Sequence, residues 1–203
     1  MLADGGYDVK IADLGGALAQ GPPYNHGLVD VIARCVADEP AILIGHSGAG
    51  ALLAPAGLAA DRVHGYLFVD AGLPIPGRSQ MSTMPSDLAD QLRQMADRDG
   101  WLPPWPQWWG DDALAELIPD DGTRQRFAAE CPRLPLGLFD EVLPEGRHAP
   151  GAYLRLSEAY DEPAALARER GWPLIELASH HLAPLTDPAI VADAMLDLLS
   201  RLL

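Results

Sequence analysis

The sequence predicts an α/β protein with a mostly parallel β-sheet and helices on both faces. Short runs of β-branched and apolar residues alternate with segments whose apolar residues recur at helical spacing, which is typical of a parallel sheet with crossover helices. The 203 residues are 48% hydrophobic, which is enough for one domain with a core. We therefore expect a single domain over residues 1–203, without internal repeats.

The first third of the chain alternates strands and helices. Strands are expected at residues 7–14, 41–44 and 63–69, because each is a short apolar run closed by glycine, proline or a polar turn. A helix is predicted over residues 27–38, where apolar side chains recur at helical spacing: Leu28, Val31, Ile32, Cys35 and Val36. Another helix should follow Ser47, and Pro55 should kink or interrupt it.

Between residues 74 and 150 the regular alternation stops. This stretch is rich in proline, methionine and tryptophan, and helices are expected at residues 86–99 and 122–130. It contains four of the five tryptophans: Trp101, Trp105, Trp108 and Trp109. Their indole rings could line an apolar pocket or pack the segment against the sheet, and the two interpretations are compatible.

The alternation resumes in the last quarter of the chain. Strands are predicted at residues 152–156 and 174–177, with a helix over residues 163–170 between them. Asp187 and Pro188 then begin a last helix with an apolar face.

Composition excludes several classes of partner. The formal net charge of −15 argues against nucleic acid or an anionic membrane as a partner. Cys35 and Cys131 have no metal-binding or redox spacing, so the cysteines predict neither a metal site nor a disulfide. The chain shows no leader pattern and no apolar run of membrane length, and we therefore expect a cytoplasmic protein.

Ser47 stands where a buried strand turns into a helix. Residues 41–44 are apolar, and small residues surround the serine: Gly45, Gly48, Ala49 and Gly50. A serine on such a turn projects its hydroxyl out of the sheet, beside N–H groups that can receive developing negative charge. A glycine-rich turn of another α/β protein is the alternative interpretation.

This segment resembles the nucleophile elbow of the α/β-hydrolase superfamily, Gly-x-Ser-x-Gly, with Ala49 in place of the last glycine. The resemblance implies a serine hydrolase that acts on an ester or similar acyl bond of a small apolar substrate, without a cofactor. It assigns the N–H of Gly48 to the oxyanion hole. It also implies that residues 74–150 form a cap over Ser47, with a pocket lined by His46 and the tryptophans named above.

Residues 179–188 resemble the superfamily segment that carries the catalytic histidine. The resemblance selects His181 as the general base, with His180 as the alternative. The acid is expected in the loop after residues 152–156, where Asp161 is favoured over Glu158. Asp70, after the preceding strand of the sheet, is the third candidate, because some superfamily members place the acid there.

The superfamily has three strands before the one predicted at residues 7–14, and residues 1–6 match none of them, so we expect either a chain that is truncated at its start or a sheet that pairs without these strands. The resemblance therefore implies a shortened sheet, which lacks the loop for a second oxyanion N–H and has an apolar edge open to association, for example in a homo-oligomer. Two alternatives to a hydrolase remain open. One is a non-catalytic member that binds a small ligand or a partner chain. The other is a lyase that uses the same residues, as in the cyanohydrin-cleaving members of the superfamily.

Overall fold

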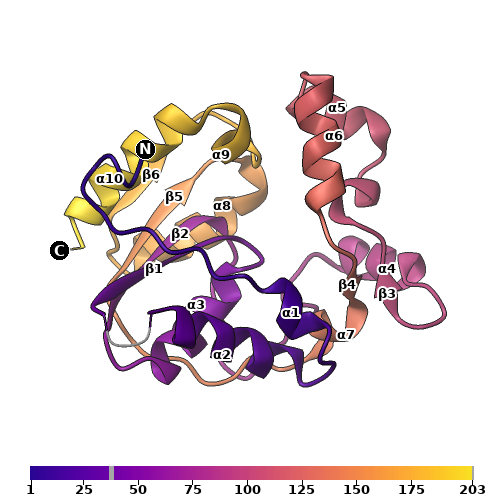
Figure 1. Ribbon diagram of the computed structural model, residues 1–203, viewed down its shortest axis with the longest axis horizontal. Helices are drawn as coiled ribbons and strands as arrows, with labels where there is room; N and C mark the ends of the chain where they lie inside the picture. Colours follow the sequence, from indigo (N-terminus) through magenta and orange to yellow (C-terminus); the bar gives the residue numbers. More distant parts are fainter. Residues whose placement is uncertain (37–38, 203) are drawn as a thin grey trace.

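A four-stranded parallel sheet forms the centre of the computed structural model, which describes residues 1–36 and 39–202 (Figure 1). The strands lie in the order β1, β2, β5 and β6, and span Ala41–Ser47, Val63–Ala71, Gly151–Arg155 and Leu174–Glu176. Phe68 of β2 lies opposite Gly45 of β1 and Tyr153 of β5. The predicted fold class is confirmed.

Helices cover both faces of this sheet because β2 is apolar on both sides. Tyr66 and Phe68 pack into the cluster that includes α2 (Tyr24–Val36), α3 (Gly50–Ala59) and α8 (Asp161–Glu169). The alternate residues, Leu67 and Val69, pack into a second cluster with α10 (Pro188–Ser200). Successive side chains of a strand point to opposite faces, so these four residues anchor the two layers of helices.

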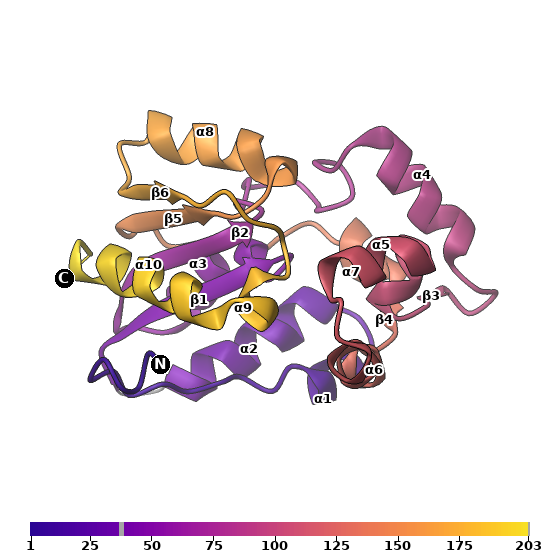
Figure 2. The same ribbon diagram turned by 90° about the horizontal axis from the view of Figure 1, so that it is seen from above.

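The segment between β2 and β5 forms an insertion that stands beside the sheet in both views (Figures 1 and 2). It contains α4 (Ser86–Met95), η1 (Trp105–Trp108), α5 (Asp111–Leu117), α6 (Asp121–Glu130) and α7 (Leu136–Asp140). Two short antiparallel strands, β3 (Trp101–Leu102) and β4 (Leu134–Pro135), tie it together. The helices expected at 86–99 and 122–130 correspond to α4 and α6. The remaining short helices are α1 (Gly15–Leu18), η2 (Glu158–Tyr160) and α9 (Ala183–Thr186).

The strand expected at residues 7–14 is wrong. These residues form neither a strand nor a helix, and the side chains of Val9 and Ile11 are 46% and 89% exposed. A strand needs a partner for its N–H and C=O groups, and in the described part of the chain β1 pairs with β2 alone. From this segment, Tyr7 packs against the cluster with α10, and Leu14 packs against the cluster that includes α2 and α3.

Two smaller expectations differ in detail. The predicted helix 27–38 starts earlier, at Tyr24, and its expected last residues, 37–38, lie outside the described residues. α3 continues through Pro55 as one helix and is not interrupted there. Of the helices described, none is long and apolar enough to cross a membrane.

Candidate active site

Ser47 occupies a strained turn between β1 and α3. Its φ angle is +57°, in the left-handed region that side chains other than glycine rarely adopt. The turn brings α3 against the end of β2, where a Cβ on Gly50 would lie 2.4 Å from the carbonyl oxygen of Gly72. Gly50 therefore provides the close approach, whereas Ala49 has ordinary helical angles and accommodates its methyl group.

Gly48 follows Ser47, and the two residues line one apolar cavity. Its N–H donates to no group among the described residues, while its carbonyl oxygen accepts from the N–H of Ala51 at the start of α3. The free N–H at the beginning of a helix is suited to an anionic oxygen. This is the position that the sequence predicts for an oxyanion donor.

His181 is held by a buried carboxylate. Its Nδ1 donates to Oδ2 of Asp70 at 2.8 Å, and Asp70 is fully buried at the C-terminal end of β2. Because the carboxylate can only accept, this hydrogen bond keeps the proton on Nδ1 and leaves Nε2 of a neutral ring free to act as a base. His181 lines the cavity that Ser47 also lines.

Asp70 accepts three more hydrogen bonds. They come from the N–H of Leu156 at 2.8 Å, the N–H of Ser157 at 2.9 Å and the hydroxyl of Ser157 at 2.6 Å. Burial alone would raise the pKa of Asp70, but the hydrogen bonds from His181, Ser157 and Leu156 outweigh it and lower the pKa below its ordinary value. The carboxylate is therefore ionised near neutral pH.

The structure does not bring Asp161 or Glu158 to the histidine. Asp161 accepts from Nε of Arg155 at 2.7 Å and forms an exposed ion pair with the same side chain. Glu158 is exposed at the start of η2. The carboxylate at His181 is thus the third candidate, Asp70 at the end of β2, whereas Asp161 is paired with Arg155.

His46 packs against His181 instead of lining the cavity, which corrects the expectation for this residue. The two rings are stacked with centroids 4.4 Å apart, and Nε2 of His46 donates to the carbonyl oxygen of His181 at 3.0 Å. Burial, with the nearby His181 ring, lowers the pKa of His46 from 6.5 to about 4. His46 is therefore neutral at pH 7 and holds the loop that carries His181.

Tyr160 is a site residue that the sequence interpretation missed. Its hydroxyl lies 3.2 Å from Oγ of Ser47, and its ring stacks on His181 with centroids 5.1 Å apart. Burial raises the pKa of Tyr160, so the phenol stays protonated near neutral pH. Ser47 is hydrogen-bonded to Tyr160 and not to His181. The only signal in the sequence was the position of Tyr160 just after β5, at the edge where the parallel strands end.

The insertion completes an apolar cavity of about 570 Å³ over Ser47. Trp105, Trp108 and Trp109 line it, as the sequence predicts, whereas Trp101 does not and lies in β3. The tryptophans also hold the insertion together, since the indole N–H of Trp108 donates to the carbonyl oxygen of Pro103. Trp108 also belongs to the buried cluster that includes Phe68 of β2.

His180, the alternative to His181 in the sequence interpretation, does not line this cavity. Its Nε2 lies 3.1 Å from the hydroxyl of Thr186, and its Nδ1 is buried without a partner in the described part of the chain. Among the side chains described, those of residues 1–36, 39–110 and 113–202, no group of three or more His, Cys, Asp or Glu residues is placed to hold a metal ion.

The comparison with protein families agrees with this geometry. The family model described as "Alpha/beta hydrolase family" matches residues 8–194. The chain belongs to the α/β-hydrolase family. A comparison with curated proteins found no match.

Several solved structures share the fold. One is an extracellular α/β-hydrolase from a Paenibacillus species, described as sharing structural and functional homology with tobacco salicylic acid binding protein 2. It has a TM-score of 0.67 and 20% identity, over 86% of this chain and 77% of that one. Another is a pyrethroid hydrolase from Sphingobium faniae, with a TM-score of 0.62 and 19% identity, over 97% and 87% of the two chains. A third is a variant of tomato methylketone synthase I in complex with β-ketoheptanoate, with a TM-score of 0.62 and 15% identity, over 92% and 82%. At these identities the likeness concerns the fold alone.

Proposed function

We propose that this α/β-hydrolase cleaves an ester or similar acyl bond of a small apolar substrate, with Ser47 as nucleophile, His181 as general base and Asp70 as the acid. The observation that carries the proposal is the hydrogen bond from His181 to buried Asp70 beside the strained Ser47, at the mouth of an apolar cavity. The known hydrolases among the structural neighbours are consistent with it.

In the proposed reaction, Nε2 of His181 takes the proton of Ser47 as Oγ attacks the carbonyl carbon. The bond to the leaving alkoxide then breaks, and the alkoxide receives the proton from His181. Water next attacks the acyl group while His181 takes its proton. The acid leaves, and the proton returns to Ser47.

These reaction steps require the Ser47 hydroxyl to give up its hydrogen bond with Tyr160 and to turn toward His181. The change is a rotation of one side chain, and catalytic hydrogen bonds are often formed only with substrate bound. The Gly48 N–H is one oxyanion donor. We propose the Tyr160 hydroxyl as a second donor, because a protonated phenol within 3.2 Å of Oγ can reach the oxygen of the carbonyl that Ser47 attacks.

Hydrolysis of p-nitrophenyl esters tests this function. The full chain should hydrolyse acyl chains that the cavity accommodates, and Ser47→Ala should abolish turnover while the protein remains folded by circular dichroism. Retention of most of the activity in purified Ser47→Ala protein would exclude the mechanism.

A lyase is a second candidate, favoured by one observation. Ser47 is bound to Tyr160, which leaves Nε2 of His181 free to take a proton from a substrate hydroxyl. Product analysis distinguishes the two chemistries, because a lyase releases a carbonyl compound without consuming water. A member of the family that only binds ligands would show neither kind of turnover.

A further inference from the structure

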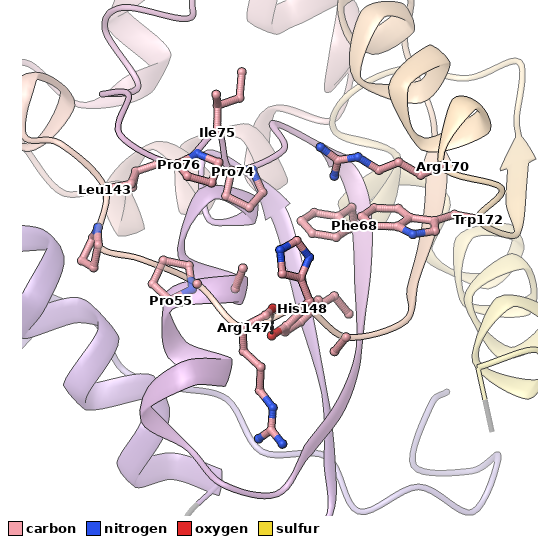
Figure 3. A pocket seen from close by; sticks show the side chains of 15 residues that line it. Pro55, Phe68, Pro74, Ile75, Pro76, Leu143, Arg147, His148, Arg170 and Trp172 are labelled. Atoms are coloured by element: carbon pink, nitrogen blue, oxygen red, sulfur yellow. Dashed lines mark hydrogen bonds between the residues drawn. The ribbon is translucent and has the colours of Figure 1, made fainter.

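A second cavity, of about 360 Å³, lies on the other side of Ile75 and Leu143, which line both cavities (Figure 3). It is bounded by α3, by β2, by the end of α8 and by the segment 143–150. This segment crosses from α7 to β5 without forming a helix, so no helix fills the space between α3 and α8. Its volume is in the range of small-molecule sites.

Hydrogen bonds to the backbone of Arg147 hold the walls of this second cavity in place. The N–H of Arg147 donates to the carbonyl oxygen of Ala54 at 2.9 Å, and the hydroxyl of Tyr66 donates to the carbonyl oxygen of Arg147 at 2.9 Å. A Cβ on Gly146 would lie 2.6 Å from Cβ of Ala54, so the segment approaches α3 as closely as a glycine allows. The cavity is therefore formed before any ligand arrives.

One side of the cavity is aromatic. Phe68 and Trp172 are stacked, with centroids 5.5 Å apart and an angle of 9° between the rings. Four prolines line the cavity together with Ile75 and Leu143: Pro55, Pro74, Pro76 and Pro144, of which the first three are labelled in Figure 3. Such a space suits a flat apolar group that can stack or pack edge-on against rings.

The charged groups at the cavity are all basic. The guanidinium of Arg170 lies over the ring of Trp172, 5.1 Å from the centroid, and no hydrogen bond or ion pair joins this guanidinium to another described residue. The ring of His148 projects into the same space, whereas the guanidinium of Arg147 extends away and donates to the carbonyl oxygen of Asp61 (Figure 3). Among the described residues, no Asp or Glu lines this cavity, in a protein of net charge −15.

We infer that the second cavity binds a small aromatic carboxylic acid as its anion. The aromatic group would pack between Phe68 and the prolines, and the carboxylate would accept hydrogen bonds from Arg170 and His148. A planar guanidinium on an aromatic ring matches a carboxylate, and one arginine with one imidazole suits a single negative charge better than a phosphate dianion. The inference does not depend on the chemistry of Ser47.

Titration of the Ser47→Ala protein with 2-naphthoate, followed by NMR of the indole N–H signals, tests the inference. The Trp172 signal, assigned with Trp172→Phe, should shift and saturate. The neutral 2-naphthamide should bind at least about fivefold more weakly, as should 2-naphthoate to Arg170→Gln. Arg168→Gln is the matched control, because Arg168 lies two residues before Arg170, in α8, and pairs with Glu176. The affinity of this variant for 2-naphthoate should remain within about twofold of the parent protein.

Three results would overturn the inference: equal affinity for the acid and the amide, unchanged affinity in folded Arg170→Gln protein, or an absence of any shift at Trp172. Shifts confined to the tryptophans of the Ser47 cavity belong to the third case. Since all measurements use protein without the nucleophile, they do not depend on whether Ser47 is catalytic.

Discussion

Nδ1 of His181 lies 2.8 Å from Oδ2 of Asp70, and this hydrogen bond joins the loop after β6 to the end of β2. The two residues are 111 positions apart in the chain. Asp70 has a φ of +42°, a left-handed conformation that aspartate and asparagine tolerate better than most residues. The strained backbone aims the carboxylate at the ring, and this contact defines the tautomer on which the proposed mechanism depends.

Asp70→Asn should lower kcat for ester hydrolysis by about 10³- to 10⁴-fold, because an amide no longer fixes the proton on Nδ1 of His181. Asparagine keeps the size and the left-handed backbone. Asp161→Asn is the matched control, since Asp161 forms only an exposed pair with Arg155, and its kcat should remain within about threefold. Steady-state kinetics of both variants measure the difference. If Asp161→Asn is the slower enzyme, the acid is misassigned.

Tyr160→Phe should lower kcat by about a hundredfold, with little change in KM, if the phenol donates to the oxyanion. The ring stacks on His181 in either case, so the substitution removes the hydroxyl alone. A faster variant would instead show that Tyr160 restrains Ser47, and an unchanged kcat would exclude both roles.

His46→Gln should change how stability depends on pH. The pKa of His46 is lowered to about 4, below the 6.5 of the unfolded chain, so unfolding takes up a proton between these values. The contribution of the neutral ring is complete above pH 6.5. It is lost as the pH falls, by up to about 3 kcal/mol near pH 4. Urea unfolding at pH 7, 6, 5 and 4 should show a steeper loss for the wild type than for the glutamine variant. Parallel curves for the two proteins would contradict the burial of a neutral His46.

Gly50→Ala should destabilise the protein by about 1–3 kcal/mol, because the new methyl group would meet the backbone of Gly72 at the end of β2. Gly16→Ala is the control, since nothing lies within 4 Å of a Cβ at Gly16. Thermal unfolding of both variants measures the effect. Equal stability of the two would show that α3 and β2 are less closely packed than described.

The sequence could predict the elements that depend on local pattern and on the common edge of parallel strands. The apolar run before Ser47 and the periodicity of α10 are such signals. His181 was selected by the resemblance of residues 179–188 to the superfamily segment, and it lines the same cavity as Ser47. The choice between Asp70 and Asp161 was not predictable in this way. It depends on the left-handed turn at Asp70 and on Arg155, which attracts Asp161.

Three other features depend on partners that a local pattern does not reveal. Residues 7–14 alternate like a strand, but no strand of the described chain pairs with them. Trp101 and Trp105 belong to the same aromatic stretch, yet Trp101 pairs with Pro135 in the small sheet of the insertion, whereas η1 places Trp105 at the cavity. Tyr160 has no sequence motif of its own. Its hydroxyl reaches Ser47 because η2 packs beside the loop of His181, with the two rings stacked.

The most direct test of the account is covalent labelling of the purified chain with a fluorophosphonate probe, followed by peptide mass spectrometry. If His181 and Asp70 activate Ser47, the probe adds once, on Ser47. No adduct should form in Ser47→Ala, and labelling should be strongly slowed in His181→Ala and Asp70→Asn. An unlabelled Ser47 in demonstrably folded wild-type protein, or equal labelling rates in His181→Ala, would contradict the central claim.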